Sequence, residues 1–276
     1  MEWFTKAAEQ GHDAAQYDLG VLYTAGRGVN QDDKKAVEWY TKAAGQGNAD
    51  AQCNLGWCYE NGRGVEQDYK KAVEWYTKAA GQGNADAQCN LGWCYEYGRG
   101  VEQDYKKAVE WYAKAAEQGF AAAQGSLGLC YANGRGVGRD DKKAVEWTFK
   151  AAEQGEAVAQ CALATLYANG QGVNQDYKKA VEWYTKAAEQ GFVKAQFNLG
   201  WCYENGRGVE QDDKKAVEWY TKAAEQGYVR AQNNLGVCYE NGRGVNQDYK
   251  KAVEWYTKAA EQGFAAAQGS LGLCYE

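Results

Sequence analysis

The sequence predicts an all-α fold in which pairs of antiparallel helices repeat every 36 residues. Three observations lead to this prediction. The stretch Ala51–Asp86 begins again, almost unchanged, at Ala87. Within each copy, apolar side chains recur at intervals of three and four residues, which is the period of an amphipathic helix. The chain also has no proline, so every residue after the first can supply the backbone N–H that a helix uses.

The copies follow one another without insertions. Seven complete repeats fill residues 15–266, a partial repeat occupies residues 1–14, and another occupies residues 267–276. The first partial repeat matches a second helix, and the last matches a first helix. A stack of repeats grows without domain breaks, so we expect residues 1–276 to form a single repeat array. The repeats begin at Ala15, Ala51, Ala87, Ala123, Ala159, Ala195, Ala231 and Ala267.

The first helix of the unit is predicted from Asn48 to about Glu60. Asn48 is a good N-cap, and Gly62 can take the left-handed conformation that ends a helix. Gly56 has no side chain, so a neighbouring helix can approach closely at that point. One face of the helix carries the apolar residues that recur every four positions, which are Ala51, Leu55 and Tyr59.

The second helix is predicted to begin after Asp68, another good N-cap, and to end at Gly83. Its apolar stripe is made of Ala72, Trp75, Tyr76, Ala79 and Ala80. The connections between the helices are short, which favours an antiparallel pair.

A tryptophan occupies the same place in every second helix. We expect these side chains to be buried in the core, because an indole can bury about 150–250 Å². One helix pair cannot cover its own Trp and Tyr, so each repeat must stack on a neighbour. The tryptophans are Trp3, Trp39, Trp75, Trp111, Trp147, Trp183, Trp219 and Trp255.

The pattern of residues resembles the Sel-one-like repeat family, a relative of the tetratricopeptide repeat. The resemblance covers the whole chain and implies a right-handed α/α superhelical solenoid that scaffolds protein complexes. Departures are few, and they affect local packing only: Ala164, Gln171, Thr148 and Phe149. The residues that carry the resemblance are Ala51, Leu55, Gly56, Tyr59, Gly62, Gly64, Val65, Asp68, Lys71, Ala72, Trp75, Tyr76, Lys78, Ala79, Ala80 and Gly83.

Charge and hydropathy exclude some classes of partner. The net charge is −6, which argues against nucleic acid because phosphate binding requires a clustered basic face. No apolar run approaches the roughly 20 residues that span a bilayer, and no basic and apolar N-terminal signal is present. We therefore expect no membrane partner and a cytoplasmic location, although a targeting segment removed before residue 1 would leave no trace.

The sequence shows no catalytic or metal-binding constellation, so we expect neither an enzyme nor a cofactor. His12 is the only histidine, and the nine cysteines include no CxxC pair. All nine lie in first helices, where we expect reduced, buried thiols. A cysteine-rich subgroup of the resembled family is linked to penicillin-type ligands, but its cysteines pair across the two helices of a repeat. The second helices here contain none.

The residues that differ between copies form the candidate partner-binding site. The third, seventh and tenth positions of the repeat share one face of the first helix, and analogy to tetratricopeptide arrays places that face on the concave side. Exposed aromatics beside acids suit a peptide or protein with apolar and basic side chains. In the alternative interpretation, the seventh position packs sideways on the next first helix. The candidate residues are Tyr17, Cys53, Trp57, Glu60, Cys89, Trp93, Glu96, Phe197, Trp201 and Glu204.

The function predicted from the sequence is thus a protein–protein interaction scaffold or adaptor without catalysis. A designed or purely structural array without a natural ligand is the alternative, and a small-molecule binder or hydrolase is a third. The two ends together supply both helices of one repeat. We therefore expect head-to-tail self-association, in which Trp3 and Phe4 pack against Leu271 and Tyr275 of another copy.

Overall fold

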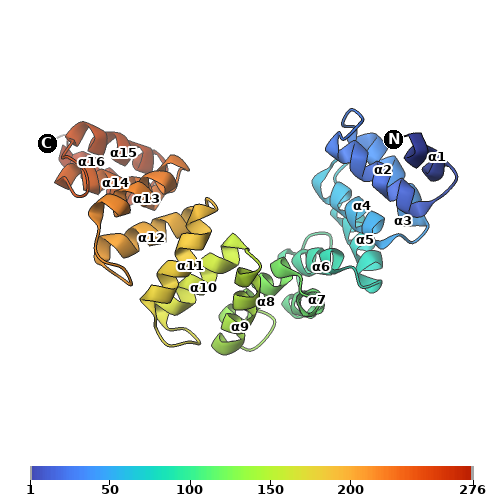
Figure 1. Ribbon diagram of the computed structural model, residues 1–276, viewed down its shortest axis with the longest axis horizontal. Coiled ribbons are helices and arrows are strands. Elements are labelled where there is room, and N and C mark those ends of the chain that lie inside the picture. Colours follow the sequence, from blue (N-terminus) through green and yellow to red (C-terminus); the bar gives the residue numbers. More distant parts are fainter. Residues whose placement is uncertain (1, 275–276) are drawn as a thin grey trace. The chain divides into compact units, whose positions relative to one another are not determined.

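The computed structural model describes residues 2–274, which form sixteen helices and no strand. From α1 to α8, and again from α9 to α16, each helix packs beside the next one in sequence, and the pairs recur every 36 residues (Figure 1). This architecture confirms the predicted all-α repeat fold. Within residues 2–274, none of the helices combines the length and the apolar character needed to cross a membrane.

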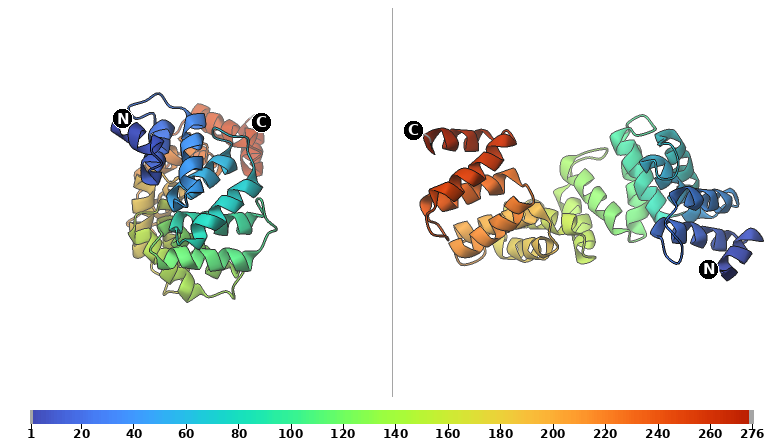
Figure 2. Two further views of the ribbon diagram at one scale, coloured as in Figure 1. Left: turned by 90° about the vertical axis from the view of Figure 1, so that its right-hand side faces the viewer. Right: turned by 90° about the horizontal axis from the view of Figure 1, so that it is seen from above.

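The helices divide into two compact units, Met1–Asp140 and Asp141–Glu276. Figure 2 shows the pairing inside each unit from two further sides. The first unit contains α1 (Glu2–Glu9), α2 (Asp13–Ala25), α3 (Asp33–Gly45), α4 (Ala49–Asn61), α5 (Tyr69–Gly81), α6 (Ala85–Tyr97), α7 (Tyr105–Glu117) and α8 (Ala121–Asn133). The second unit contains α9 (Asp141–Glu153), α10 (Ala157–Asn169), α11 (Tyr177–Glu189), α12 (Val193–Asn205), α13 (Asp213–Glu225), α14 (Val229–Asn241), α15 (Tyr249–Glu261) and α16 (Ala265–Cys274).

Side-chain caps set the start of α4 and α5, as the sequence predicts, whereas α8, α10, α12 and α14 begin without a hydrogen bond to a capping side chain. The side chain of Asn48 accepts a hydrogen bond from the backbone of α4, and that of Asp68 accepts from the backbone of α5. Helix α4 ends at Gly62, which has a left-handed φ of 65°. Helix α5 ends at Gly81, two residues before the predicted end at Gly83.

A buried tyrosine of the second helix lies at the core of every complete repeat except the fourth, which has the buried Thr148 at that place. Tyr76 is 0% exposed, and its ring lies against Gly56 of α4. A Cβ atom added to Gly56 would lie 2.8 Å from this ring, so the close approach predicted at Gly56 is confirmed and a side chain there would displace the tyrosine.

The tryptophans are not core residues, so this prediction was wrong. Trp75 is half-buried and packs at the edge of the cluster that α3 and α4 form in the preceding part of the chain. The ammonium group of Lys78 lies 3.8 Å from the centroid of its ring, and the same Lys–Trp contact recurs along both units. The indole therefore keeps one face toward a solvated lysine, which costs less than burying that charge.

Buried glutamines connect successive repeats. Gln52 is 5% exposed and donates to the carbonyl of Ala44 at the end of α3. Gln82, at the end of α5, donates in turn to the side-chain oxygen of Gln52 at 2.8 Å. The buried amide of Gln52 is thus satisfied by the end of the preceding repeat and by the second helix of its own repeat.

The cysteines whose side chains the structure describes are free thiols, and all of them except the partly exposed Cys89 are buried. Burial raises the pKa of Cys53 to about 12 and that of Cys58 to about 11. These thiols therefore stay protonated at neutral pH and behave as small apolar side chains.

Candidate functional site

The predicted partner-binding residues all lie on first helices, but they belong to two separate units. In the second unit, Phe197, Trp201 and Glu204 share α12. In the first unit, α2, α4 and α6 carry the remaining seven, which are Tyr17, Cys53, Trp57, Glu60, Cys89, Trp93 and Glu96.

Exposure separates these residues into two groups. Trp57 is 40% exposed and Trp201 is 38% exposed, so the seventh position of the repeat presents aromatic surface. The third position is more enclosed: Cys53 is 7% exposed, and its Sγ lies 4.0 Å from the side-chain nitrogen of Asn90 on α6. The surface available to a partner is therefore narrower than the predicted stripe.

The glutamates are engaged within the protein. Glu60 accepts a hydrogen bond of 2.7 Å from the hydroxyl of Tyr76. Glu204 accepts one of the same length from Tyr220, and its other oxygen lies 3.0 Å from the guanidinium of Arg243. Glu96 is held in the same way, by Tyr112 and Arg135. Each carboxylate thus satisfies the hydroxyl of a buried tyrosine, and the carboxylates of Glu96 and Glu204 are also neutralised by an arginine.

Arginines cover part of the aromatic surface in the first unit. The guanidinium of Arg99 lies 4.0 Å from the ring centroid of Trp93 and 5.6 Å from that of Tyr69. Arg63 lies farther from Trp57, at 5.8 Å. Arg63 donates to the carboxylate of Asp33 at 2.8 Å, whereas Arg99 makes no ion pair within residues 2–274. Because a stacked guanidinium keeps its in-plane N–H groups free to donate, Arg99 presents donors beside the aromatic rings.

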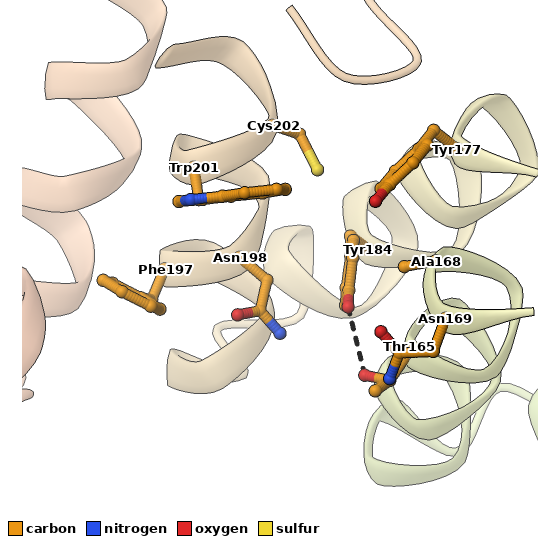
Figure 3. Close-up of a pocket in the computed structure, with 9 residues that line it drawn as sticks. All are labelled: Thr165, Ala168, Asn169, Tyr177, Tyr184, Phe197, Asn198, Trp201 and Cys202. Carbon is orange, nitrogen blue, oxygen red and sulfur yellow. Dashed lines mark hydrogen bonds between the residues drawn. The ribbon is translucent and has the colours of Figure 1, made fainter. Parts of the chain in front are cut away.

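The fifth repeat contains a cavity that comes from two small side chains. Thr165 and Ala168 of α10 occupy the places that Trp57 and Glu60 occupy in α4. A cavity of about 310 Å³ lies beside them, between α10, α11 and α12 (Figure 3). The hydroxyl of Tyr184, without a glutamate to bond, forms a 3.0 Å hydrogen bond with Thr165 instead.

The cavity combines aromatic walls with polar groups. Burial raises the pKa of Tyr184 to about 12, although its hydrogen bonds to Thr165 and Asn198 lower the pKa somewhat, so its hydroxyl keeps its proton at neutral pH. In Figure 3 the ring of Trp201 and the amide of Asn198 extend from α12 toward Tyr184. The lining residues are Thr165, Ala168, Asn169, Tyr177, Tyr184, Phe197, Asn198, Trp201 and Cys202.

Of this lining, only Phe197 and Trp201 were predicted from the sequence. The signal was present, because Thr165 and Ala168 are small where other repeats carry Trp and Glu. The buried Tyr184 carried no such signal, since a tyrosine stands at that place in nearly every repeat. Its different role follows from the residues that face it.

The lining supplies hydrogen-bonding groups and aromatic faces, which are suited to binding. Among residues 2–274, no group of three or more His, Cys, Asp or Glu side chains is placed to hold a metal ion. The cavity lining itself contains no acidic, basic or histidine side chain. Recognition of a ligand therefore depends on its fit to the aromatic walls and amides, and on charges at the rim.

Helix pairs of constant length that pack in sequence order define an α/α repeat protein. The crystal structure of c5321, a protective antigen of uropathogenic Escherichia coli strains with an SLR fold, superposes with a TM-score of 0.87 at 45% identity. The similarity covers 100% of the present chain, which spans 59% of the length of that antigen.

A Sel1 repeat protein from Oxalobacter formigenes is also similar, with a TM-score of 0.79 at 39% identity over 98% of this chain and 78% of that one. Yeast Tom70 shares the fold alone, with a TM-score of 0.53 at 15% identity over 99% of this chain and 59% of Tom70. A search of curated proteins found no match.

The sequence model of the Sel1 repeat matches nearly all of the chain, and the chain belongs to the Sel1 repeat family. This solenoid fold is generally a non-catalytic scaffold for protein interactions. The cytoplasmic location and the single array stay predictions. The matched segments are residues 1–12, 13–48, 49–84, 85–120, 121–156, 157–192, 193–228 and 229–264.

Proposed function

We propose that this chain is an adaptor without catalytic activity that binds a protein or peptide segment on the face formed by the first helices. The observation that carries the proposal is the exposure of Trp57 and Trp201 at the same place in their repeats, one in each unit. A large aromatic side chain left 38–40% exposed gains free energy when a partner covers it.

An apolar partner segment has more support than a basic one. The sequence-based expectation of basic side chains rested on Glu60, Glu96 and Glu204. All three accept hydrogen bonds from tyrosines, and Glu96 and Glu204 also contact arginines. A basic side chain would have to compete with these groups. Covering the exposed aromatic rings requires no such exchange.

Peptide binding with a matched pair of variants tests the proposal. Peptides are selected on the intact chain from a displayed random library, and their affinity is measured by fluorescence anisotropy. The double variant Trp57→Ala, Trp93→Ala should weaken binding at least ~10-fold. Tyr249→Ala, which removes a side chain that is 62% exposed on a second helix, serves as the control. An unchanged affinity of the double variant, with the melting temperature retained, would contradict the proposal.

We also propose self-association through the two ends, and the exposure of apolar side chains there favours it. Trp3 is 79% exposed, Phe4 is 45% exposed and Leu273 is 74% exposed. Trp39, which occupies the place of Trp3 in the next repeat, packs instead at the edge of a buried cluster. Helix α16 of one copy offers Trp3 and Phe4 of another a comparable surface. Of the other two residues of the predicted contact, Leu271 is partly buried against a core cluster of its own chain, and Tyr275 lies outside the described residues.

Light scattering over a range of protein concentrations tests this second proposal. The mass should rise with concentration, and the variant Trp3→Ser, Phe4→Ser should remain at the monomer mass. A constant monomer mass of the unchanged chain at high concentration would contradict it.

A further inference from the structure

In four of the seven complete repeats a glutamate of the first helix accepts a hydrogen bond from the buried tyrosine of the second helix. Glu204 is the example in the second unit: it accepts from the Tyr220 hydroxyl at 2.7 Å and faces the Arg243 guanidinium at 3.0 Å. Its side chain is only 17% exposed. The carboxylate therefore satisfies a buried hydroxyl and a cation of the following repeat at the same time.

The fifth repeat keeps the groups that surround this carboxylate and lacks the carboxylate itself. Ala168 stands in the place of Glu204, Tyr184 in that of Tyr220, and Arg207 in that of Arg243. The guanidinium of Arg207 lies 5.5 Å from the ring centroid of Tyr177, which lines the cavity. Within the described part of the chain, it has no carboxylate within ion-pair distance.

An amide at the cavity is also left without its usual bond. Asn61, Asn205 and Asn241 each donate to the carbonyl four residues earlier, at 2.9 Å. The exposed side chain of Asn169, at the same place in the fifth repeat, makes no hydrogen bond to any residue in the described range. Its N–H groups are available beside Thr165 and Tyr184 (Figure 3).

The size of the cavity fits a side chain. Its volume of about 310 Å³ is at the lower end of the range of ligand sites, and the Trp201 and Phe197 rings supply apolar walls. The side-chain amide of Asn169 is a donor at the cavity, and the Arg207 cation lies nearby. The hydroxyl of Tyr184 donates to Thr165, because Thr165 donates to the carbonyl of Cys161, and Asn198 bonds to Tyr184. A ligand that brings a carboxylate on a short apolar stem matches both parts. A basic side chain would meet only the guanidinium and no acid.

We propose that this cavity binds the side chain of a glutamate from a partner protein, whose carboxylate takes the place that Glu204 fills in its own repeat. The inference rests on the proposed function, because it supplies one recognition element of the partner segment. The glutamate of the partner accepts from Asn169 and pairs with Arg207, and the hydroxyl of Tyr184 turns from Thr165 to the carboxylate, as Tyr220 donates to Glu204. Apolar residues on either side of it pack on Trp201 and Phe197.

Nuclear magnetic resonance of the intact, isotope-labelled chain tests the proposal with the tripeptide acetyl-Leu-Glu-Leu-amide. The signals to follow are the indole N–H of Trp201 and the side-chain amide of Asn169. The glutamate peptide should shift both signals saturably. Its glutamine analogue should bind at least ~10-fold more weakly, because it loses the charge that Arg207 requires. Equal binding of the two peptides, or no saturable binding of either, would overturn the proposal.

Two further peptides fix the source of the carboxylate and the sign of the charge. Acetyl-Leu-Leu-Leu with a free carboxyl end should bind more weakly than the glutamate peptide, because its carboxylate lacks the ethylene stem. Acetyl-Leu-Lys-Leu-amide should not bind at the cavity. Equal or tighter binding of either peptide would overturn the assignment to glutamate.

A substitution that restores the internal carboxylate provides a direct competitor. Ala168→Glu places in the fifth repeat the residue that several other repeats carry there, so the fold should persist and the peptide should lose at least ~10-fold in affinity. Ala132→Glu is the matched control, because it makes the same change at the same place in the fourth repeat. Arg207→Ala, at an exposed position, should weaken the glutamate peptide and leave the glutamine peptide unchanged. Undiminished binding to Ala168→Glu would overturn the proposal.

The proposed function and this inference fail in different ways. Library peptides that depend on Trp57 and Trp93, together with equal binding of the glutamate and glutamine peptides, would retain the adaptor and reject the glutamate site. Library peptides insensitive to Trp57 and Trp93 would reject the predicted face of the first unit. In that event the Ala168→Glu variant reports on the cavity of the second unit by itself.

Discussion

The repeats 51–86 and 159–194 have the same two helices and differ in how the space beside their buried tyrosine is filled. In the first, Glu60 accepts from the hydroxyl of Tyr76, and Trp57 stands one turn earlier. In the second, the corresponding residues are small, Tyr184 bonds to a threonine, and a cavity of about 310 Å³ remains. The scaffold tolerates both arrangements without a change in the bounds of its helices.

This difference separates the residues that build the stack from those that vary its surface. Tyr76 and Tyr184 are both buried, at 0% and 4% exposure, so the core of the pair is retained. The first helix changes at the exposed Trp57 and at Glu60, and also in the core, where Ala164 stands in the place of Gly56 and Leu166 in that of Cys58. A repeat that supplies its own carboxylate is closed, whereas one that lacks it has donors available for a partner.

Truncation of the buried tyrosine should give the largest difference in unfolding free energy between the two repeats. Tyr76→Ala should cost about 3–5 kcal/mol of unfolding free energy, because it empties a packed site and leaves Glu60 without its donor. Tyr184→Ala should cost less, since that ring already borders a cavity and faces no carboxylate. Urea unfolding of both variants measures the costs. Equal losses of unfolding free energy in the two variants would show that Glu60 and the packing around it do not stabilise their repeat further.

Removal of the hydroxyl alone should give a smaller difference in unfolding free energy between the two repeats. Tyr76→Phe should cost about 1–3 kcal/mol, because the half-buried Glu60 then has an unsatisfied oxygen. Tyr184→Phe should cost about 0.5–1.5 kcal/mol, since Thr165 can still donate to the carbonyl of Cys161. Combining Tyr76→Phe with Glu60→Ala in a double-mutant cycle isolates the pair. A coupling energy of zero would contradict the role given to this hydrogen bond.

Alkaline pH should destabilise repeat 51–86, which has two cysteines, more strongly than repeat 159–194, which has one. Burial raises the pKa of Cys58 to about 11 from an ordinary value of 9.0. Because the folded value is the higher one, the stabilisation is complete below pH 9 and is lost as the pH rises toward 11. Cys58→Leu, which copies Leu166 of the other repeat, should reduce the loss of stability between about pH 8 and about pH 10.5 by about 1–2 kcal/mol. Urea midpoints at both pH values check this, and an identical loss in the variant would refute it.

Closing the open repeat should give the smallest effect on stability. Ala168→Glu should raise the unfolding free energy by about 0.5–1.5 kcal/mol, since the new carboxylate accepts from Tyr184 and faces Arg207. The increase should shrink when Arg207→Ala is added, because the charge pair is then lost. Thermal unfolding followed by circular dichroism measures both. A decrease caused by Ala168→Glu alone would show that the cavity is not shaped for a carboxylate.

The sequence predicts much of this architecture because the residues that start, end and pack the helices recur at the same places in successive repeats. The caps at Asn48 and Asp68, the turn at Gly62 and the close contact at Gly56 all follow from residue types whose backbone preferences are local. The position of Trp75 did not follow. A stripe of apolar residues shows which side of a helix faces inward, but it does not distinguish the centre of the buried face, where Tyr76 lies, from its edge.

The candidate site was predicted less completely than the fold. Trp201 and Phe197 were identified because they vary between copies, and variation marks a surface. The hydrogen bonds of Glu60 and Glu204 with the tyrosine hydroxyls were not foreseen, because they join residues 16 positions apart through a geometry that helical periodicity does not describe. The cavity depends on small residues at places where other repeats have large ones, and this replacement can be recognised only by comparing the repeats.

A transplanted cavity tests the central claim most directly. The variant Trp57→Thr, Glu60→Ala gives repeat 51–86 the small residues of repeat 159–194, with Tyr76, Asn90 and Trp93 already in place. Titration with acetyl-Leu-Glu-Leu-amide should then show a second site, with the indole N–H of Trp93 shifting saturably and the glutamine analogue binding at least ~10-fold more weakly. A Trp93 signal that does not respond, or responds equally to both peptides, would contradict the account.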